Sequence, residues 1–180
     1  MTAVENDLLL ERQLCFGLSV ASRSVITAYK PVLAELQLTH PQYLVMLALW
    51  EQAPRRVKDI SAALLLESAT LSPLLKRLEA LGYLTRTKDG ADERALAIDL
   101  TPAGAALREK ALSVPGTMMS RLGLTRESAT ALHHSMMALI DAATHADAGA
   151  GPETTASRTA ASQTVMTGTP DHDTSAMADN

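Results

Sequence analysis

The fold is decided by residues Val57 to Leu100, which read VKDISAALLLESATLSPLLKRLEALGYLTRTKDGADERALAIDL. In the first half of this stretch, apolar residues recur every three or four positions, the spacing of an amphipathic helix. This predicts two short helices joined by Leu66 to Ala69, and so short a connection makes helices cross, as in a helix-turn-helix. The apolar stripes consist of Ile60, Ala63, Leu64, Leu71, Leu74, Leu75, Leu78 and Leu81.

The spacing changes after Gly82, a residue suited to end a helix because it adopts the left-handed conformation easily. Tyr83 to Lys88 alternate between apolar and polar residues, which predicts a strand. Asp89 and Gly90 are strong turn formers, and Ala95 to Leu100 predicts a second strand. The chain is therefore expected to be mainly α with a small β-hairpin wing: a winged helix-turn-helix.

Charge is distributed unevenly along the chain. The 180 residues carry 16 basic and 20 acidic side chains, a net charge of -4, which by itself argues against nucleic-acid binding. From Arg55 to Arg94, however, there are 8 basic and 6 acidic residues, so this part is +2 and the remainder is -6. A local basic excess favours DNA binding by the motif. A solvated surface used for protein contacts is the alternative.

Size and composition limit the class of protein. A chain of 180 residues with 47% apolar residues has room for one domain and a tail. The early apolar run Leu8 to Leu10 is flanked by acidic residues, unlike a signal peptide, and no apolar run approaches the ~18 residues that span a membrane. A single cysteine excludes an intrachain disulfide and the common multi-cysteine zinc sites. We expect a cytoplasmic protein with no cofactor.

Helices are also predicted before the central stretch. Asn6 or Asp7 can cap a helix that continues to about Tyr29, and Pro31 is expected to end or kink it. Thr39 to Gln42 has the spacing of a capping box, which predicts the start of a helix over Tyr43 to Gln52.

Two further helices are predicted after the hairpin. Thr101 caps a helix through about Leu112, Pro115 and Gly116 interrupt the pattern, and Thr125 caps a last helix. The apolar stripes at both ends lack partners within the chain, which predicts a homodimer. We divide the chain into N-terminal dimerisation helices (1–38), a winged helix-turn-helix (39–100), C-terminal dimerisation helices (101–144) and a tail (145–180) that is expected to be disordered because it has few large apolar residues.

Four segments resemble the MarR family of regulators and, within it, the organic hydroperoxide sensors of the OhrR type. They read QLCFGLSVASRSVITAYKP from Gln13, LTHPQYLVMLALWE from Leu38, TLSPLLKRLEALGYLTR from Thr70 and DERALAIDLTPAG from Asp92. The resemblance implies a homodimeric repressor that binds palindromic double-stranded operator DNA and releases it when its cysteine is oxidised. The chain departs from the family in having Ser19 and His40 where tyrosines are usual, while Tyr29 is retained.

Cys15 is the candidate redox-sensing residue, together with Tyr29. A lone cysteine is commonly a small apolar packing residue, but Arg12 and the nearby helix N-terminus both favour the thiolate, the form that reacts with an organic hydroperoxide. A sulfenic acid at Cys15 would persist, take up a low-molecular-weight thiol or oxidise further, since no second cysteine exists.

The candidate DNA-binding residues lie in the second helix of the motif and in the hairpin. Ser68 can contact DNA or simply cap the helix, and Lys76 and Arg77 can contact DNA or form a solvated face. Arg94 is expected to enter the minor groove, and Asp92 to hold Arg94 or Arg86, or else to form only a surface ion pair. The full set is Ser68, Thr70, Ser72, Lys76, Arg77, Arg86, Asp92 and Arg94.

Two rival functions stay open. In the first, a small aromatic or phenolic ligand in the dimer cleft releases the DNA and Cys15 is only structural. In the second, the protein is a thiol enzyme such as a peroxidase, which is disfavoured because neither a resolving thiol nor an acid/base set is evident. His133 and His134 are adjacent, so on a helix they point in different directions and make a poor metal pair.

Overall fold

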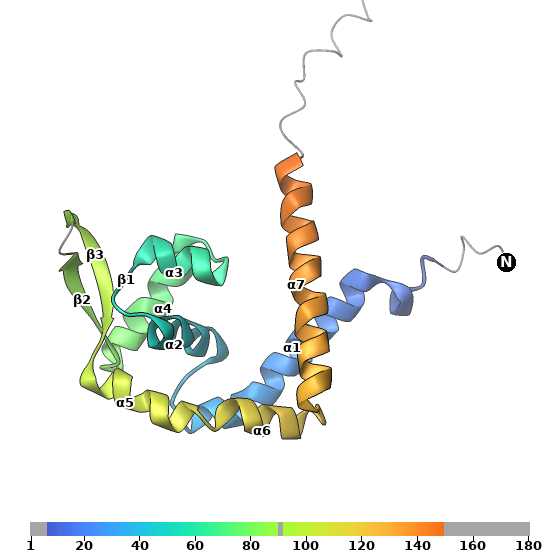
Figure 1. Cartoon of the computed structure of the whole chain (residues 1–180), viewed down its shortest axis with the longest axis horizontal. Helices are drawn as coiled ribbons and strands as arrows, with labels where there is room; N and C mark the ends of the chain where they lie inside the picture. The colour runs from blue at the N-terminus through green and yellow to red at the C-terminus, as the bar shows by residue number, and fades with distance from the viewer. Residues whose placement is uncertain (1–6, 90–91, 150–180) are drawn as a thin grey trace, which may run out of the picture. The chain divides into compact units, whose positions relative to one another are not determined.

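The computed structural model describes residues 7–89 and 92–149, with the backbone alone for residues 88–89, 92–96 and 147–149. Figure 1 shows helices joined to one small sheet, so the predicted mainly α fold with a β wing is confirmed. The elements are a 3-10 turn Leu10–Arg12, α1 Leu14–Ala34, α2 His40–Glu51, β1 Arg55–Arg56, α3 Val57–Leu64, α4 Ser68–Ala80, β2 Leu84–Asp89, β3 Asp92–Leu100, α5 Pro102–Ala111, α6 Val114–Arg121 and α7 Arg126–Gly149.

Helices α3 and α4 form the helix-turn-helix. The link between them is Leu65–Glu67, shorter than the predicted Leu66 to Ala69, because Leu65 adopts the left-handed conformation (φ 51°) and turns the chain at once. The predicted apolar stripes of these two helices are buried in the middle, but Ala63 and Leu81 are exposed. The buried residues are Ile60, Leu71, Leu75 and Leu78.

The sheet has three antiparallel strands in the order β1-β3-β2. The hairpin was predicted, whereas β1 was not, since two residues are too few to show an alternating pattern. In the register of the sheet, Arg55 and Arg86 lie on either side of the buried Ile98. Directly opposite residues share a face, so both arginines lie on the face that packs against the helices.

Contacts at the base of the wing fix the hairpin to α5. Gly82 has φ +76°, as predicted for the end of α4. The Thr101 hydroxyl donates to the Gly82 carbonyl (2.6 Å) and accepts from the Gly104 amide (3.0 Å), which confirms Thr101 as an N-cap. A Cβ at Gly104 would lie 2.1 Å from the Tyr83 carbonyl oxygen, so α5 can approach the strand only with glycine there.

The N-terminal helix differs from the prediction at both ends. It starts at Leu14 rather than after Asn6 or Asp7, and it runs through Pro31 to Ala34. Proline costs one backbone hydrogen bond, but Leu33 is completely buried, and packing of this last turn outweighs that loss. The predicted capping box at Thr39 and Gln42 is confirmed, and α2 follows directly.

The helix after Thr101 ends at Ala111, close to the predicted Leu112, and the predicted interruption falls at Leu112 and Ser113, just before Pro115 and Gly116. Pro115 lies in the first turn of α6, where its missing N–H is not needed. Thr125 precedes α7 and accepts from the Ser128 amide (3.1 Å), as predicted for a cap. Helix α7 continues past His145 to Gly149, and residues 150–180 of the predicted tail lie outside the described part of the chain.

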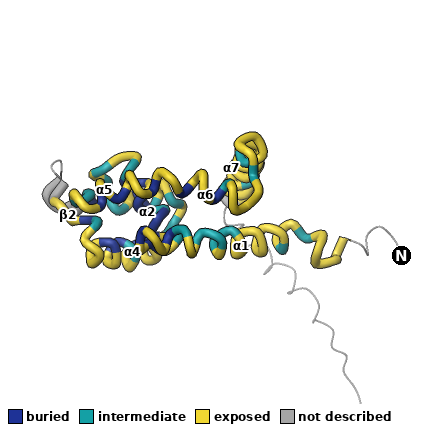
Figure 2. The backbone as a smooth tube through the Cα atoms, turned by 90° about the horizontal axis from the view of Figure 1, so that it is seen from below, coloured by how far each residue is buried: buried dark blue, intermediate teal, exposed yellow. Residues whose placement is uncertain are grey.

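The chain divides into two compact units after Thr130, within α7. The core belongs to the first unit and joins α1, α2 and the helix-turn-helix to β3, α5 and α6. Figure 2 shows the buried residues concentrated along α2, α4, α5 and α6, whereas the first half of α1 and most of α7 are exposed. Among the described residues, no helix is long and apolar enough to cross a membrane.

Candidate nucleic-acid interface

The second helix of the motif, α4, carries the predicted DNA-binding residues on its exposed side. Successive residues are about 100° apart on a helix, so the exposed face opposite Leu71, Leu75 and Leu78 is centred on Lys76 and the small residues around it. Thr70 and Arg77 lie on one flank of that face. Ser68 and Ser72 lie on the other flank. The residues are therefore brought to one exposed surface, though spread across its width.

One of these side chains, Ser72, has a local role within α4, and another, Ser68, lacks the capping role offered as its alternative. Ser68 is the first residue of the helix and Glu67 precedes it as the N-cap, so the alternative in which Ser68 caps the helix is wrong. The Ser72 hydroxyl donates to the Ser68 carbonyl at 2.9 Å, which leaves its oxygen free only to accept. Pro73 lies inside α4, in keeping with its start at Ser68.

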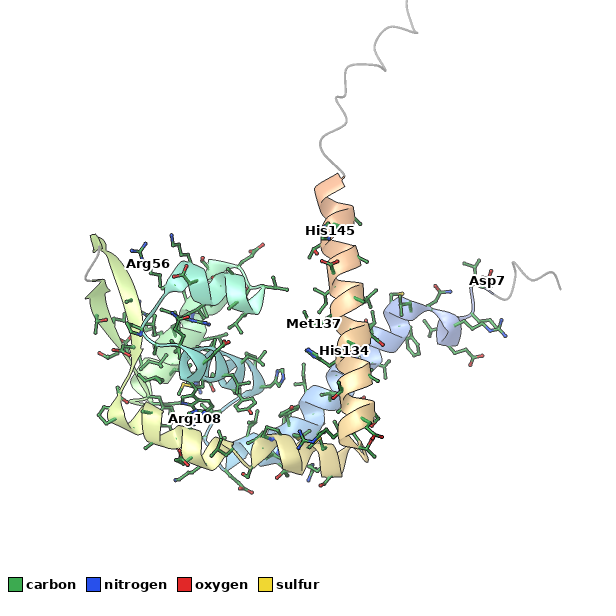
Figure 3. All side chains as sticks on the ribbon, viewed as in Figure 1. Asp7, Arg56, Arg108, His134, Met137 and His145 are labelled. Carbon is green, nitrogen blue, oxygen red and sulfur yellow. The ribbon has the colours of Figure 1, made fainter. Side chains whose placement is uncertain are left out.

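The wing presents Arg86 close to α4. Arg86 Nε donates to Glu79 Oε2 at 3.0 Å, so its described partner is a carboxylate of the last turn of α4. Asp92 and Arg94 lie in β3, but their side chains are outside the description, and the pairing predicted for Asp92 stays a prediction. Figure 3 labels Arg56, the last residue of β1, which directly precedes α3.

An aromatic cluster lies behind this surface, between α1 and α2. The ring of Tyr29 is 5.2 Å from that of His40 and 6.2 Å from that of Tyr43, and Tyr43 is 6.3 Å from Trp50. The Trp50 indole N–H donates to the Gly104 carbonyl at 2.9 Å. The cluster therefore joins α1 to the base of the wing through packed rings and one hydrogen bond.

Burial of the cluster shifts the acidity of its members. It raises the pKa of Tyr29 and of Tyr43, the latter also through the neighbouring Tyr29, because a phenolate loses hydration there. It lowers the pKa of His40 for the same reason, since the imidazolium is the charged form. All three rings are therefore held neutral near pH 7.

Cys15 is exposed and is the second residue of α1. It lies in the first helical turn, where backbone N–H groups lack partners and partial positive charge accumulates. Tyr29 is 14 positions further along the same helix, a rise of about 21 Å. The structure therefore does not bring Cys15 and Tyr29 together within one chain.

A cavity of about 290 Å³ lies beside the aromatic cluster, between α2 and the α5–α6 segment. Its lining is mostly apolar, with the charged groups of Glu51 and Arg108 among the lining residues. The sequence pattern did not indicate this cavity. In residues 7–89 and 92–149, no three histidine, cysteine or acidic side chains gather to form a metal site.

Comparisons with known proteins agree with this fold. A family model described as transcriptional regulator SarA/Rot matches residues 27–110. The organic hydroperoxide resistance transcriptional regulator of Bacillus subtilis is 46% identical over 130 residues, 72% of this chain and 86% of the relative. The chain belongs to the MarR family of winged-helix transcriptional regulators, in the OhrR group. This OhrR-type protein is accordingly a DNA-binding regulator, and its relatives are regulators rather than enzymes.

Solved structures of related regulators share the fold. Reduced AbfR bound to DNA is 33% identical, with a TM-score of 0.65, and the match covers 76% of this chain and 93% of that one. AbfR, from Staphylococcus epidermidis, has also been solved in a disulfide form (32% identity, TM-score 0.54, 76% and 96% covered). Bordetella bronchiseptica BpsR, whose DNA binding is regulated by 6-hydroxynicotinic acid, is 25% identical with a TM-score of 0.65, over 72% of this chain and 94% of that one.

Sequence reasoning missed two residues of this region. Glu79 is the partner of Arg86, but the two are seven positions apart across a helix end and a turn, so no periodic pattern joins them. Trp50 was placed in a helix without a role, although a buried indole N–H normally finds an acceptor. The need of the indole N–H for an acceptor could have been predicted from the sequence, but the sequence could not have identified Gly104 as that acceptor.

Proposed function

We propose that this regulator is a homodimeric repressor that binds a palindromic operator and releases it when an organic hydroperoxide oxidises Cys15. The observation that carries the proposal is the position of the chain's single cysteine, exposed in the first turn of α1. The thiol there is exposed on the single chain, where a peroxide can reach it from solvent. The name of the Bacillus subtilis relative supports the same class of oxidant.

The proposed oxidation uses the peroxide as its only oxidant. The Cys15 thiolate attacks the terminal peroxide oxygen, so that an S–O bond forms, the O–O bond breaks, and the alcohol leaves after taking up a proton. The sulfenic acid then has no cysteine in its own chain to meet. Attack by a low-molecular-weight thiol gives a mixed disulfide and water, while a second peroxide gives the sulfinic acid.

Unpaired apolar surface supports the homodimer. On α1, Leu14 and Leu18 are 64% and 39% exposed, and α7 exposes its own row of large apolar residues. Figure 3 shows His134 and Met137 on α7. Exposed apolar helix faces of this length favour burial against a second copy. The exposed apolar residues of α7 are Leu132, Met136, Met137 and Ile140.

The dimer would also couple oxidation to DNA release. Because about 21 Å of helix separates Cys15 from Tyr29 in one chain, the phenol that we propose to hold the Cys15 sulfur is Tyr29 of the other subunit. Packing of Tyr29 against His40 supports this role, since it holds the tyrosine ring in a fixed position. Oxidation adds bulk and removes the anionic acceptor, so the subunits shift and the two recognition helices lose their spacing.

The DNA contacts themselves are part of the proposal. We assign base or phosphate contacts to Ser68, Thr70, Ser72, Lys76 and Arg77 on α4, all exposed on one surface. We assign the minor groove to Arg94, with Asp92 orienting it. An arginine on a wing is suited to this groove because its narrow parts have a strongly negative potential.

The cavity beside Tyr43 and Trp50 favours a second candidate function. Its volume of about 290 Å³ and its apolar lining suit a small aromatic acid, with Arg108 near to take the carboxylate. Regulation of BpsR by 6-hydroxynicotinic acid supports such chemistry in this fold. In that case Cys15 would be a structural residue, and the ligand alone would release DNA.

Operator binding before and after one equivalent of cumene hydroperoxide per subunit tests the first proposal. The DNA probe is the duplex that the reduced protein selects from a random pool, and each reaction is run with and without a low-molecular-weight thiol. We expect release, accompanied by a mass increase of the Cys15 peptide that corresponds to the sulfenic acid or the mixed disulfide. Undiminished binding by protein whose Cys15 is fully oxidised in both reactions would overturn the proposal.

A further inference from the structure

An ion pair joins the two elements that face DNA. Glu79 belongs to the last turn of α4, and Arg86 to the middle of β2. Arg86 Nε and Glu79 Oε2 are 3.0 Å apart, and both side chains are partly covered, with 37% and 40% exposed. The chain between them is short and turns at Gly82, so this contact is well placed to set the angle between the helix and the wing.

The opposite edge of the sheet has a matching contact. Arg55 and Arg86 lie on one face, on either side of Ile98, which is 1% exposed. Arg55 Nη2 lies 3.5 Å from Glu51 Oε2 of α2 and donates to Gln52 Oε1 at 3.3 Å. Each edge strand of the sheet is therefore tied to a helix by an arginine and a glutamate. The pair at Arg86 is the one that reaches α4, which carries most of the candidate DNA-binding residues.

The position of Glu79 argues against a simple role for Arg86 on phosphate. Glu79 lies on the same flank of α4 as Ser68 and Ser72, where a carboxylate repels the DNA backbone. An arginine already bonded to that carboxylate is part of a neutral pair, so it releases few counterions from DNA. We propose that Glu79 is a positioning residue: it holds Arg86, and with it the wing, at the angle to α4 that DNA binding requires, so that Arg86 acts through Glu79 and not through phosphate.

This inference rests on DNA binding by the family and not on the oxidation of Cys15. It can fail while the redox proposal stands, and the reverse also holds. A half-exposed ion pair contributes little to folding because water and salt screen it. Loss of Glu79 should therefore leave the urea midpoint of unfolding nearly unchanged and alter operator affinity instead.

The first test compares Glu79→Gln with Glu109→Gln, which removes the same charge from an exposed site on α5. The probe is the duplex that the reduced full-length protein selects from a random pool. Positioning predicts that Glu79→Gln weakens binding by about three- to tenfold, while Glu109→Gln binds like the parent or slightly tighter. The proposal would be overturned if Glu79→Gln bound DNA as tightly as Glu109→Gln. That result would mean that removing the Glu79 carboxylate only relieves its repulsion of the DNA backbone.

The second test separates positioning from direct contact through rescue and salt dependence. Arg86→Glu should bind weakly, and the swapped pair Glu79→Arg with Arg86→Glu should return to within about threefold of the parent. Arg86→Gln should lower affinity without changing the slope of log affinity against log salt. Either of two results would show that Arg86 binds DNA itself. One is a swapped pair that binds DNA no better than Arg86→Glu. The other is a slope of log affinity against log salt that is shallower in Arg86→Gln than in the parent, by about 0.9 for each phosphate left without its cation.

Discussion

The ring of Tyr29 meets the ring of His40 edge-on, with centroids 5.2 Å apart and planes at 63°. This contact joins α1 to the first turn of α2. It places a titratable base beside Tyr29, at a position where the resemblance to the OhrR type leads us to expect a tyrosine. Since burial lowers the pKa of His40, protonation of this ring in the folded chain costs free energy of folding, because the imidazolium loses hydration there.

His40 should make stability depend on pH. Its folded pKa lies below its usual value of 6.5, so below that pH the unfolded chain binds more protons than the folded chain. The stabilisation is fully present above pH 6.5 and is lost as pH falls towards the folded pKa. We expect the parent's free energy of unfolding to fall more steeply below pH 6.5 than that of His40→Gln, by urea titration at one fixed protein concentration. His133→Gln serves as the control. If the free energies of unfolding of the parent and of His40→Gln fall in parallel below pH 6.5, His40 is not the group responsible.

Gly104→Ala should destabilise the protein by about 1 to 3 kcal/mol, because its Cβ would lie 2.1 Å from the backbone oxygen of Tyr83. The matched control is Gly116→Ala, where a Cβ meets nothing within 4 Å and alanine favours the helix by up to about 1 kcal/mol. Urea unfolding of the two variants measures the difference. Equal stability of the two variants would mean that α5 can move away from the wing freely.

Arg94→Ala should weaken operator binding by about 1 to 3 kcal/mol and reduce the dependence on salt. Lys110→Ala removes the same charge from α5 and serves as the control. Binding is measured by fluorescence anisotropy over a range of salt concentrations. Full affinity in Arg94→Ala would remove the wing tip from the proposed interface.

Removal of residues 150–180 should leave the dimer intact, since these residues lie beyond α7. Removal of everything from Arg126 onward should abolish it, because the exposed apolar row of α7 is then gone. Light scattering at micromolar concentration gives the mass of each chain. A monomer from the first deletion or a stable dimer from the second contradicts the assigned dimer surface.

Periodicity and turn chemistry were sufficient to predict the central motif. The stripe through Leu71, Leu75 and Leu78, the left-handed Gly82 and the cap at Thr101 are all local signals, and each is confirmed. The errors arose where tertiary packing overrides a local preference. Pro31 was expected to end or kink its helix; it does not end it, since the helix runs on to Ala34 and buries Leu33 in its last turn.

The candidate interface could be proposed from the sequence as a set of residues but not as an arrangement. The polar and basic positions of α4 follow from its helical spacing, and all are exposed. The Arg86–Glu79 pair and the Trp50–Gly104 hydrogen bond could not be predicted, since each joins residues that only the folded chain brings together. Cys15 could be singled out, but its suggested partner Tyr29 depends on a second subunit.

The central claim is that chemistry at Cys15 releases DNA, and the peroxide response of Cys15→Ser tests it most directly. Serine keeps the size of the side chain but cannot form a sulfenic acid or a mixed disulfide. The parent and Cys15→Ser are bound to the selected duplex and treated with one equivalent of organic hydroperoxide per subunit, with a low-molecular-weight thiol present. We predict that the parent dissociates and Cys15→Ser stays bound. Equal release of both proteins would contradict the redox account and leave a ligand in the cavity beside Tyr43 and Trp50 as the trigger.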